Sequence, residues 1–330
     1  MFSLGYTQVQ NPLQYTGRMN NTHPVILISG SSGMVGRNLI EHPESNKYNI
    51  LTPTSKELDL LDYSAVRCYF QNMKPDIIIH AAGRVGGIQA NMAHPVDFLV
   101  QNWDMGRNLL IAARESGVKN LLNLGSSCMY PRDAENPLKE TMVLKGELES
   151  TNEGYALAKV SVARLAQYLC QEDGTLQYKT LIPCNLYGRW DKFDPSHSHL
   201  VPAIIVKVHQ AMEKSDEFVE IWGDGLARRE FMYAGEVADA IWYCVQNLNK
   251  LPQNTNIGIG QDYSIMDYYT AVAAVCGYKG SFKYDLSRPV GMKQKLVDTK
   301  ILNDLGWRSK QSLIQGIEKT VEFYRKEIFK

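Results

Sequence analysis

Residues 25–36 have the sequence VILISGSSGMVG, a short aliphatic run that passes directly into a glycine-rich turn and then a helical pattern. A continuous apolar run of this length is typical of a strand buried on both faces of a parallel sheet. The three glycines serve different purposes, since Gly30 permits the tight turn, Gly33 lets a ligand approach the backbone, and Gly36 lets the helix pack closely on the strand. The free N–H groups of the helix amino terminus then attract phosphates. The stretch therefore predicts a dinucleotide site.

The chain repeats this alternation of strand and helix through its first half. We expect further strands at 48–51, 76–80, 120–124 and 178–182, and helices at 64–73, 96–116 and 153–171. This order predicts an α/β fold with a Rossmann-type doubly wound parallel sheet. After Pro183 the pattern is less regular, with helices expected at 202–214, 236–249 and 312–326.

This pattern also suggests a division into domains. We expect a polar extension over 1–24, a dinucleotide-binding domain over 25–185 and a smaller, mixed α/β substrate domain over 186–330. Segments around 229–260 are expected to return to the first domain.

Composition excludes several classes of function. The 330 residues include 35 Lys plus Arg and 35 Asp plus Glu, so no basic excess points to a nucleic-acid partner. No run of 18 apolar residues suggests a membrane span. The six cysteines are scattered and lack metal-ligand spacing, which predicts no metal site and suits a reducing, cytoplasmic compartment.

The type of dinucleotide depends on the end of the second strand. NAD binders usually place a carboxylate there, which binds the ribose 2′-hydroxyl. Here residues 51–56 read LTPTSK, without a carboxylate. Ser55 and Lys56 instead favour a 2′-phosphate, so NADP(H) is the expected cofactor.

Three residues predict carbonyl chemistry. Ser126 follows the strand at 120–124, and Tyr155 and Lys159 stand one helical turn apart on one helix face. A Lys ammonium beside a phenol is expected to lower the pKa of Tyr155 from about 10. Tyr155 could then protonate a ketone oxygen as hydride reaches the carbon, with Ser126 as a second hydrogen-bond donor.

Further stretches carry a family resemblance: GMVG (33–36), VGGI (85–88), GSSCMYP (125–131), NLYG (185–188), PSHSH (195–199) and REF (229–231). On these, the chain from about 25 to 307 resembles the extended short-chain dehydrogenase/reductases, and among them the GDP-L-fucose synthase family of GDP-4-keto-6-deoxy-D-mannose 3,5-epimerase/4-reductases. The resemblance implies a GDP-linked 4-keto-6-deoxy sugar as substrate and a homodimer built on the helices at 96–116 and 153–171.

The resemblance also assigns roles to individual residues. Cys128 and His199 would be the acid/base pair of epimerisation, since a thiolate with a lowered pKa can abstract a proton beside the ketone and an imidazole can return one. The implied substrate contacts are Ser126, Cys128, Asn185, Lys207, Trp222, Arg229 and Lys295. The implied cofactor contacts are Gly30, Ser32, Gly33, Met34, Val35, Gly36, Ser55, Lys56, Asp59, Leu60, Ala81, Ala82, Tyr155, Lys159, Pro183, Asn185, Leu186 and His199.

The chain departs from the family pattern at several positions. Ser32 and Ser55 stand where relatives commonly carry arginines near the 2′-phosphate, and Lys207, Val290 and Arg189 replace the familiar Arg, Asp and Pro. These departures leave a modified sugar open, either a 3,6-dideoxy sugar, as for a GDP-L-colitose synthase that inverts only C5, or a heptose. A 4,6-dehydratase or a pure 4-epimerase is less favoured. A nonenzymatic NADP-sensing scaffold is the alternative from a different class.

Overall fold

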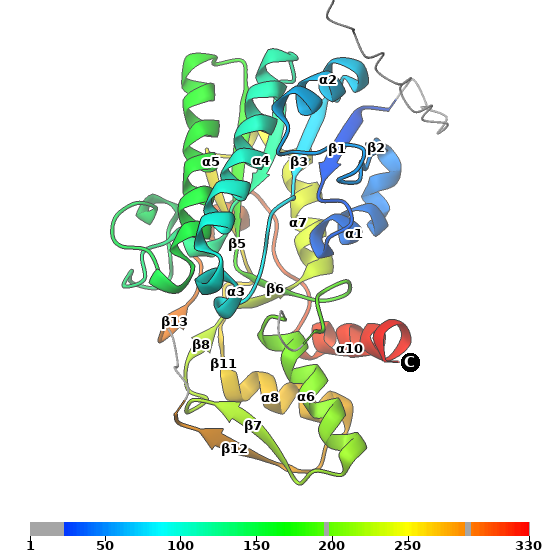
Figure 1. The fold of residues 1–330 in the computed structure, drawn as a ribbon, viewed down its shortest axis with the longest axis vertical. Coiled ribbons are helices and arrows are strands. Elements are labelled where there is room, and N and C mark those ends of the chain that lie inside the picture. Colours follow the sequence, from blue (N-terminus) through cyan, green and yellow to red (C-terminus); the bar gives the residue numbers. More distant parts are fainter. Residues whose placement is uncertain (1–22, 195–197, 288–291, 330) are drawn as a thin grey trace, which may run out of the picture.

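The computed structural model describes residues 23–194, 198–287 and 292–329 of the chain (Figure 1). The expected extension over 1–24 lies outside these residues except for its last two. Val290 and the first three residues of the PSHSH stretch also lie outside them.

A parallel sheet of six strands forms the centre of the larger part of the molecule (Figure 1). Its order is β10-β5-β4-β3-β1-β2, and all of its neighbouring pairs are parallel. The strands are β1 (Val25–Ser29), β2 (Asn49–Leu51), β3 (Ile77–His80), β4 (Asn120–Leu124), β5 (Gln177–Pro183) and β10 (Asn254–Ile257). The predicted α/β parallel sheet is confirmed, and β10 joins it from the second half of the chain.

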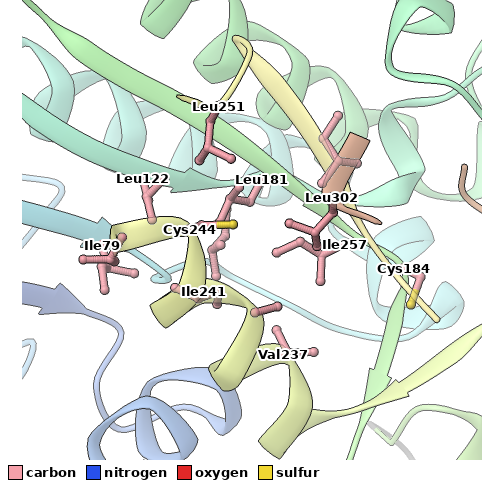
Figure 2. Packing of buried hydrophobic residues seen from close by; sticks show 14 of the residues in the cluster. Ile79, Leu122, Leu181, Cys184, Val237, Ile241, Cys244, Leu251, Ile257 and Leu302 are labelled. Carbon is pink, nitrogen blue, oxygen red and sulfur yellow. The ribbon is translucent and has the colours of Figure 1, made fainter. Parts of the chain in front are cut away.

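Helices cover both faces of this sheet because its buried strands alternate their side chains between the two faces. Leu27, Ile78 and Leu121 pack against one set of helices, whereas Ile26, Ile79 and Leu122 pack against the other. The first set is α2 (Tyr63–Met73), α4 (Pro95–Glu115) and α5 (Glu153–Glu172), and the second is α1 (Met34–Glu41) and α7 (Ala234–Gln246). Figure 2 shows Ile241 and Val237 of α7 in the second core, with Leu181 and Leu302.

A smaller part lies below the sheet in Figure 1 and has its own apolar core. Its helices are α6 (Leu200–Lys214), α8 (Ile265–Cys276) and α10 (Leu313–Phe323). Its strands pair as β7 (Phe218–Trp222) with β12 (Ser281–Asp285), as β8 (Arg228–Arg229) with β11 (Tyr263–Ser264) and β13 (Gln294–Lys295), and as β6 (Asn185–Tyr187) with β9 (Phe231–Tyr233). Two short helices, α3 (Ile88–Ala93) and α9 (Lys300–Asp304), complete the set of α-helices in the described residues. None of the helices described is both long and apolar enough to cross a bilayer.

The strand order positions the site. β1 lies between β2 and β3, so the chain leaves β1 toward one edge of the sheet and later returns on its other side. At such a switch point the loops after neighbouring strands part and open a crevice at the carboxyl ends. Here the crevice lies between the turn that begins at Gly30 and the loop that begins at Ala81.

Candidate active site

A cavity of about 750 Å3 opens at this switch point. Its walls come from the ends of six different strands and the loops after them, together with the amino-terminal turns of α1 and α5. The lining segments are 29–36, 53–61 in part, 81–86 in part, 124–126, 183–186 and 190–192, with Met105, Tyr155, Lys159 and His199.

The glycine turn has the geometry that a pyrophosphate needs. Gly30 has a φ of +73°, and a Cβ placed on it would meet the Ala82 backbone N at 2.6 Å. A Cβ on Gly36 would collide with the Gly30 carbonyl, so helix and strand could not pack as they do. A Cβ on Gly33 would meet only the Gly30 O, at 3.3 Å, and that position lines the cavity. No side chain caps α1, so its first N–H groups are available to phosphate oxygens.

Nearly all the predicted cofactor residues line this one cavity. The exception is Lys56, which is exposed in the turn where Thr54 donates to the Glu57 carboxylate at 2.8 Å. A contact between Lys56 and the cofactor therefore stays a prediction. Ser32 and Ser55 do line the cavity, as does Asp59.

Ser126, Tyr155 and Lys159 meet at the end of β4. The Ser126 hydroxyl interacts with the Tyr155 phenol, and the Lys159 Nζ lies 5.7 Å from the centre of the Tyr155 ring. Lys159 also donates to the Leu124 carbonyl at 2.9 Å. All three residues line the cavity, so one ligand atom in it could contact both hydroxyls.

The expected direction of the Tyr155 pKa is wrong for this structure. Burial raises the pKa of the phenol well above its ordinary value of 10.0, and the nearby Cys128 adds to the rise. Lys159 does not outweigh this effect of burial, because its ammonium donates to the Leu124 carbonyl and stays 5.7 Å from the centre of the Tyr155 ring. Burial lowers the pKa of Lys159 itself to about 8. Tyr155 is therefore a neutral phenol at neutral pH, which is the protonated form that a proton donor requires.

Cys128 lies directly behind this group and does not itself line the cavity. It occupies the short 3-10 turn Ser127–Met129, is only 5 % exposed, and packs against Tyr155 and Leu148. The expected lowering of its pKa is also corrected: burial raises the pKa of the thiol, although the charge of Lys295 and the Ser126 hydroxyl act in the opposite direction. The desolvation of a thiolate outweighs these attractions.

His199 precedes α6 and lines the cavity from the smaller part of the molecule. Burial lowers the pKa of its imidazole, and the charge of Lys192 lowers it further. His199 is thus a neutral imidazole at neutral pH, and Cys128 a neutral thiol. In these forms the imidazole can accept a proton and the thiol can donate one, and Cys128 becomes a base only after it loses its proton.

Four of the predicted substrate residues form two pairs outside the cavity. Arg229 and Lys295 are register partners in the parallel strands β8 and β13, and burial lowers the pKa of both groups. Their charges interact, and Lys295 also interacts with Cys128, so this cationic pair lies next to Cys128. The second pair joins α6 and β7, where the Lys207 Nζ lies 5.0 Å from the centre of the Trp222 ring. Asn185 lines the cavity and donates to the Glu230 carbonyl at 3.0 Å.

Several cavity residues are absent from the set that the sequence predicts, above all Trp190, Asp191 and Lys192. They follow the NLYG stretch in an irregular segment, and nothing in their own spacing marks them as functional. Cys184 also lines the cavity, although the sequence assigns it no role. Within the described ranges, no three His, Cys, Asp or Glu side chains gather so that they could hold a metal ion.

Comparisons with known proteins agree with this geometry. The sequence profile of the NAD dependent epimerase/dehydratase family matches residues 26–260. The chain is 55 % identical to the GDP-L-colitose synthase of Yersinia pseudotuberculosis, over 92 % of this chain and 98 % of that protein. It is 48 % identical to the GDP-L-fucose synthase of Azorhizobium caulinodans, over 91 % and 96 %. A solved GDP-mannoheptose C4 reductase from Campylobacter jejuni with NADP bound superposes with a TM-score of 0.83 at 30 % identity, covering 92 % of this chain and 99 % of that one.

Proposed function

The chain belongs to the NAD dependent epimerase/dehydratase family, and from that premise we propose that it epimerises and then reduces a GDP-linked 4-keto-6-deoxy sugar with NADPH. It is an enzyme of the epimerase/reductase type. The observation that carries the proposal is the meeting of Ser126, Tyr155 and Lys159 in the dinucleotide cavity, with Cys128 directly behind them.

The cofactor is NADP(H). The glycine turn leaves open the space that a pyrophosphate needs, and residues 51–56, which contain no carboxylate, place Ser55 on the cavity wall. Solved relatives with NADP bound share the fold. NADPH, when bound here, supplies the hydride that reduces C4 of the sugar.

In the reduction, Tyr155 donates a proton to the C4 oxygen from its neutral phenol. Ser126 hydrogen-bonds the same oxygen. Lys159 stabilises the phenolate that Tyr155 becomes, because an ammonium with a pKa of about 8 is still mostly charged at neutral pH. Burial strengthens this attraction, since few waters screen the two groups.

In the epimerisation, Cys128 and His199 exchange protons at a carbon next to the ketone. Loss of a proton there gives an enolate, whose oxygen Ser126 and Tyr155 can stabilise by hydrogen bonds. Cys128 lies on the β4 side, whereas His199 approaches from the start of α6. One residue removes a proton and the other returns one to the opposite face, which inverts the carbon.

The GDP moiety would be held by the two cationic groups described above. Arg229 and Lys295 offer adjacent positive charges beside the reacting residues, which suits the diphosphate. Trp222 is 49 % exposed and could stack on the guanine base, with Lys207 at its face.

Two sugars compete as the substrate. The higher identity to the Yersinia GDP-L-colitose synthase favours GDP-4-keto-3,6-dideoxy-D-mannose, for which only the inversion of C5 has meaning. The similarity to GDP-L-fucose synthases favours GDP-4-keto-6-deoxy-D-mannose, the sugar that the family resemblance implies. A heptose is less favoured, because the solved heptose reductases are only about 30 % identical.

A homodimer in the cytoplasm completes the proposal. Val96 on α4 is 69 % exposed and Tyr168 on α5 is 56 % exposed, with Val100 and Leu157 also on the surface of these two helices. Exposed apolar residues on two packed helices suit a four-helix contact with a second copy. Light scattering that gives a monomer at micromolar concentration would remove this part of the proposal.

The test offers NADPH and each of the two GDP-sugars in deuterated water, and NMR locates the deuterium in each product. Deuterium at C5 with preference for the dideoxy substrate means GDP-L-colitose synthesis. Deuterium at both C3 and C5 with preference for the other sugar means GDP-L-fucose synthesis. Oxidation of NADPH without exchange would leave a simple 4-reductase and contradict the roles of Cys128 and His199. No turnover with any GDP-4-keto sugar would favour the sensing scaffold.

A further inference from the structure

The segment between β6 and α6 supplies an outer wall to the dinucleotide cavity. Trp190, Asp191 and Lys192 are consecutive, and all three line that cavity together with the glycine turn. The contacts that hold this segment in place involve residues that the proposed chemistry does not use.

Trp190 is the anchor of the segment. Its φ of +68° lies in the left-handed region, which is costly for a bulky side chain, so surrounding contacts must stabilise it. The Arg37 guanidinium lies 4.2 Å from the centre of the indole ring, and the indole N–H donates to the Glu41 carboxylate at 2.7 Å. Phe323 packs edge-on against the ring, with 4.7 Å between centroids.

Arg189 ties the same segment to α1. Its guanidinium lies 2.8 Å from the second oxygen of the Glu41 carboxylate, and the Asn38 amide donates to the Arg189 carbonyl at 3.2 Å. Arg37 in turn donates to the Ser32 carbonyl in the glycine turn at 3.2 Å. We call these five residues, Arg37, Asn38, Glu41, Arg189 and Trp190, the α1 latch.

The segment is held at its other end as well. The Lys192 ammonium donates to the Val85 carbonyl, in the loop after β3, at 3.3 Å. The chain therefore bridges from α1 to the β3 loop, and these are the two walls between which the switch-point crevice opens.

Asp191 sits in the middle of this bridge. One carboxyl oxygen accepts from the Lys192 backbone N–H at 2.7 Å, whereas the other, Oδ2, is buried without a hydrogen-bond partner among the described residues. A buried polar atom without a partner is costly, and because Asp191 lines the cavity, a hydrogen-bond donor bound there would relieve that cost. Burial raises the pKa of this carboxyl to about 7, so it can face a dinucleotide with less charge repulsion than an ordinary aspartate.

We propose that residues 189–192 are a strap over the bound dinucleotide, in which the α1 latch positions Asp191 to accept a hydrogen bond from an uncharged donor of the cofactor, a ribose hydroxyl or the carboxamide. Asp191 touches the cofactor in this proposal, and Trp190 is a positioning residue. The inference rests on the proposed cofactor but not on the identity of the sugar.

The test measures NADPH itself, without any sugar. Titration gives the dissociation constant, and stopped-flow displacement gives the rate of NADPH release. We expect Trp190→Ala to release NADPH about tenfold faster, which corresponds to about 1.4 kcal/mol. Trp190→Phe keeps a ring over Arg37 but loses the N–H to Glu41, so a smaller increase is expected. Trp103→Phe, on α4 and away from the cavity lining, is the matched control and should not change the rate.

A double variant distinguishes the opening of the α1 latch from a general loss of stability, because residues of one latch should have effects that do not add. Arg37→Gln should also speed release, and the double variant with Trp190→Ala should be no faster than the worse single variant, because both changes open the same latch. Asp191→Leu should weaken NADPH binding about tenfold, whereas Asp191→Asn keeps an acceptor and should stay within about twofold.

The outcomes distinguish the inference from the proposed function. A wild-type chain that binds no NADPH refutes the cofactor, and with it the proposed function. The strap alone is overturned if the wild-type chain binds NADPH and the folded variants release it at the wild-type rate. The variants that decide this are Trp190→Phe, Arg37→Gln and Asp191→Leu. Additive effects of Arg37→Gln and Trp190→Ala would overturn the latch.

Discussion

Arg229 and Lys295 are register partners in β8 and β13, which places two half-buried cations side by side next to Cys128. Like charges on neighbouring strands repel, and burial adds to the cost, as the lowered pKa of each group indicates. Such a pair is unfavourable in the free protein and becomes favourable when an anion lies between the charges. The arrangement therefore suits a ligand that carries two phosphates.

Removing either charge should weaken the binding of the sugar nucleotide and leave the binding of the cofactor unchanged. For Arg229→Gln or Lys295→Gln we expect KM for the GDP-sugar to rise about tenfold or more, because a charge-assisted hydrogen bond is lost. The NADPH dissociation constant should not change, since neither residue lines the cofactor cavity. Steady-state kinetics and NADPH titration measure the two effects separately. An equal loss of affinity for both ligands would argue against a diphosphate site here.

The proposed order of events predicts that reduction can be stopped while proton exchange continues. Tyr155→Phe removes the donor to the C4 oxygen, and the loss of a positioned acid costs about 100- to 10,000-fold in rate. Ser126 still supports the enolate, so exchange of the sugar proton with deuterated solvent should persist at a reduced rate. NMR of the unreduced substrate measures the exchange. If the exchange rate of Tyr155→Phe falls as low as that of Cys128→Ser, Tyr155 is essential for the epimerisation as well.

Epimerisation should depend on pH through Cys128. The reactive form is the thiolate, and the raised pKa keeps the thiol protonated at neutral pH. Because the thiolate fraction grows with pH, the exchange rate should rise up to and beyond the ordinary thiol pKa of 9.0. The measurement is the rate of deuterium exchange in the wild-type enzyme as a function of pH. A rate that is already level at neutral pH would show instead that bound substrate or His199 holds Cys128 as a thiolate.

The reduction step should respond to pH in the opposite sense. Lys159 loses its charge as pH rises through about 8, and the phenolate left on Tyr155 then lacks its stabilising ammonium. Single-turnover oxidation of NADPH should therefore slow above that pH. Lys159→Met should flatten the decline and lower the rate at neutral pH. A decline that survives in Lys159→Met would assign the titration to another group.

Replacing glycine by alanine at two positions of the glycine turn should have two different effects, one on stability and one on NADPH binding. Gly36→Ala places a methyl group against the Gly30 carbonyl and the Ser31 Cα, so we expect a loss of about 1–3 kcal/mol in the free energy of unfolding. Gly33 lines the cavity, and the methyl group of Gly33→Ala would meet only the Gly30 O, at 3.3 Å. Gly33→Ala should fold normally and bind NADPH more weakly. Thermal unfolding and NADPH titration of both variants distinguish the two roles.

Much of the larger part of the molecule could be predicted from short-range patterns. The strand at Val25–Ser29 and the strand at Asn120–Leu124 have the predicted bounds, and the helix around Tyr155 and Lys159 begins at the predicted residue. These elements depend on periodicity and on glycine positions, which are properties of neighbouring residues. The glycine turn and its dinucleotide site follow from the same local signal.

Only the tertiary structure decided how the site residues influence one another. Whether Lys159 or burial dominates at Tyr155 depends on where the ammonium points, and here it points to Leu124. The pairing of Arg229 with Lys295 depends on strand register, and the α1 latch joins residues from distant parts of the chain. Local sequence patterns specify backbone geometry because steric limits act between near neighbours. Charge, desolvation and hydrogen bonding at this site depend on residues that the fold alone brings together.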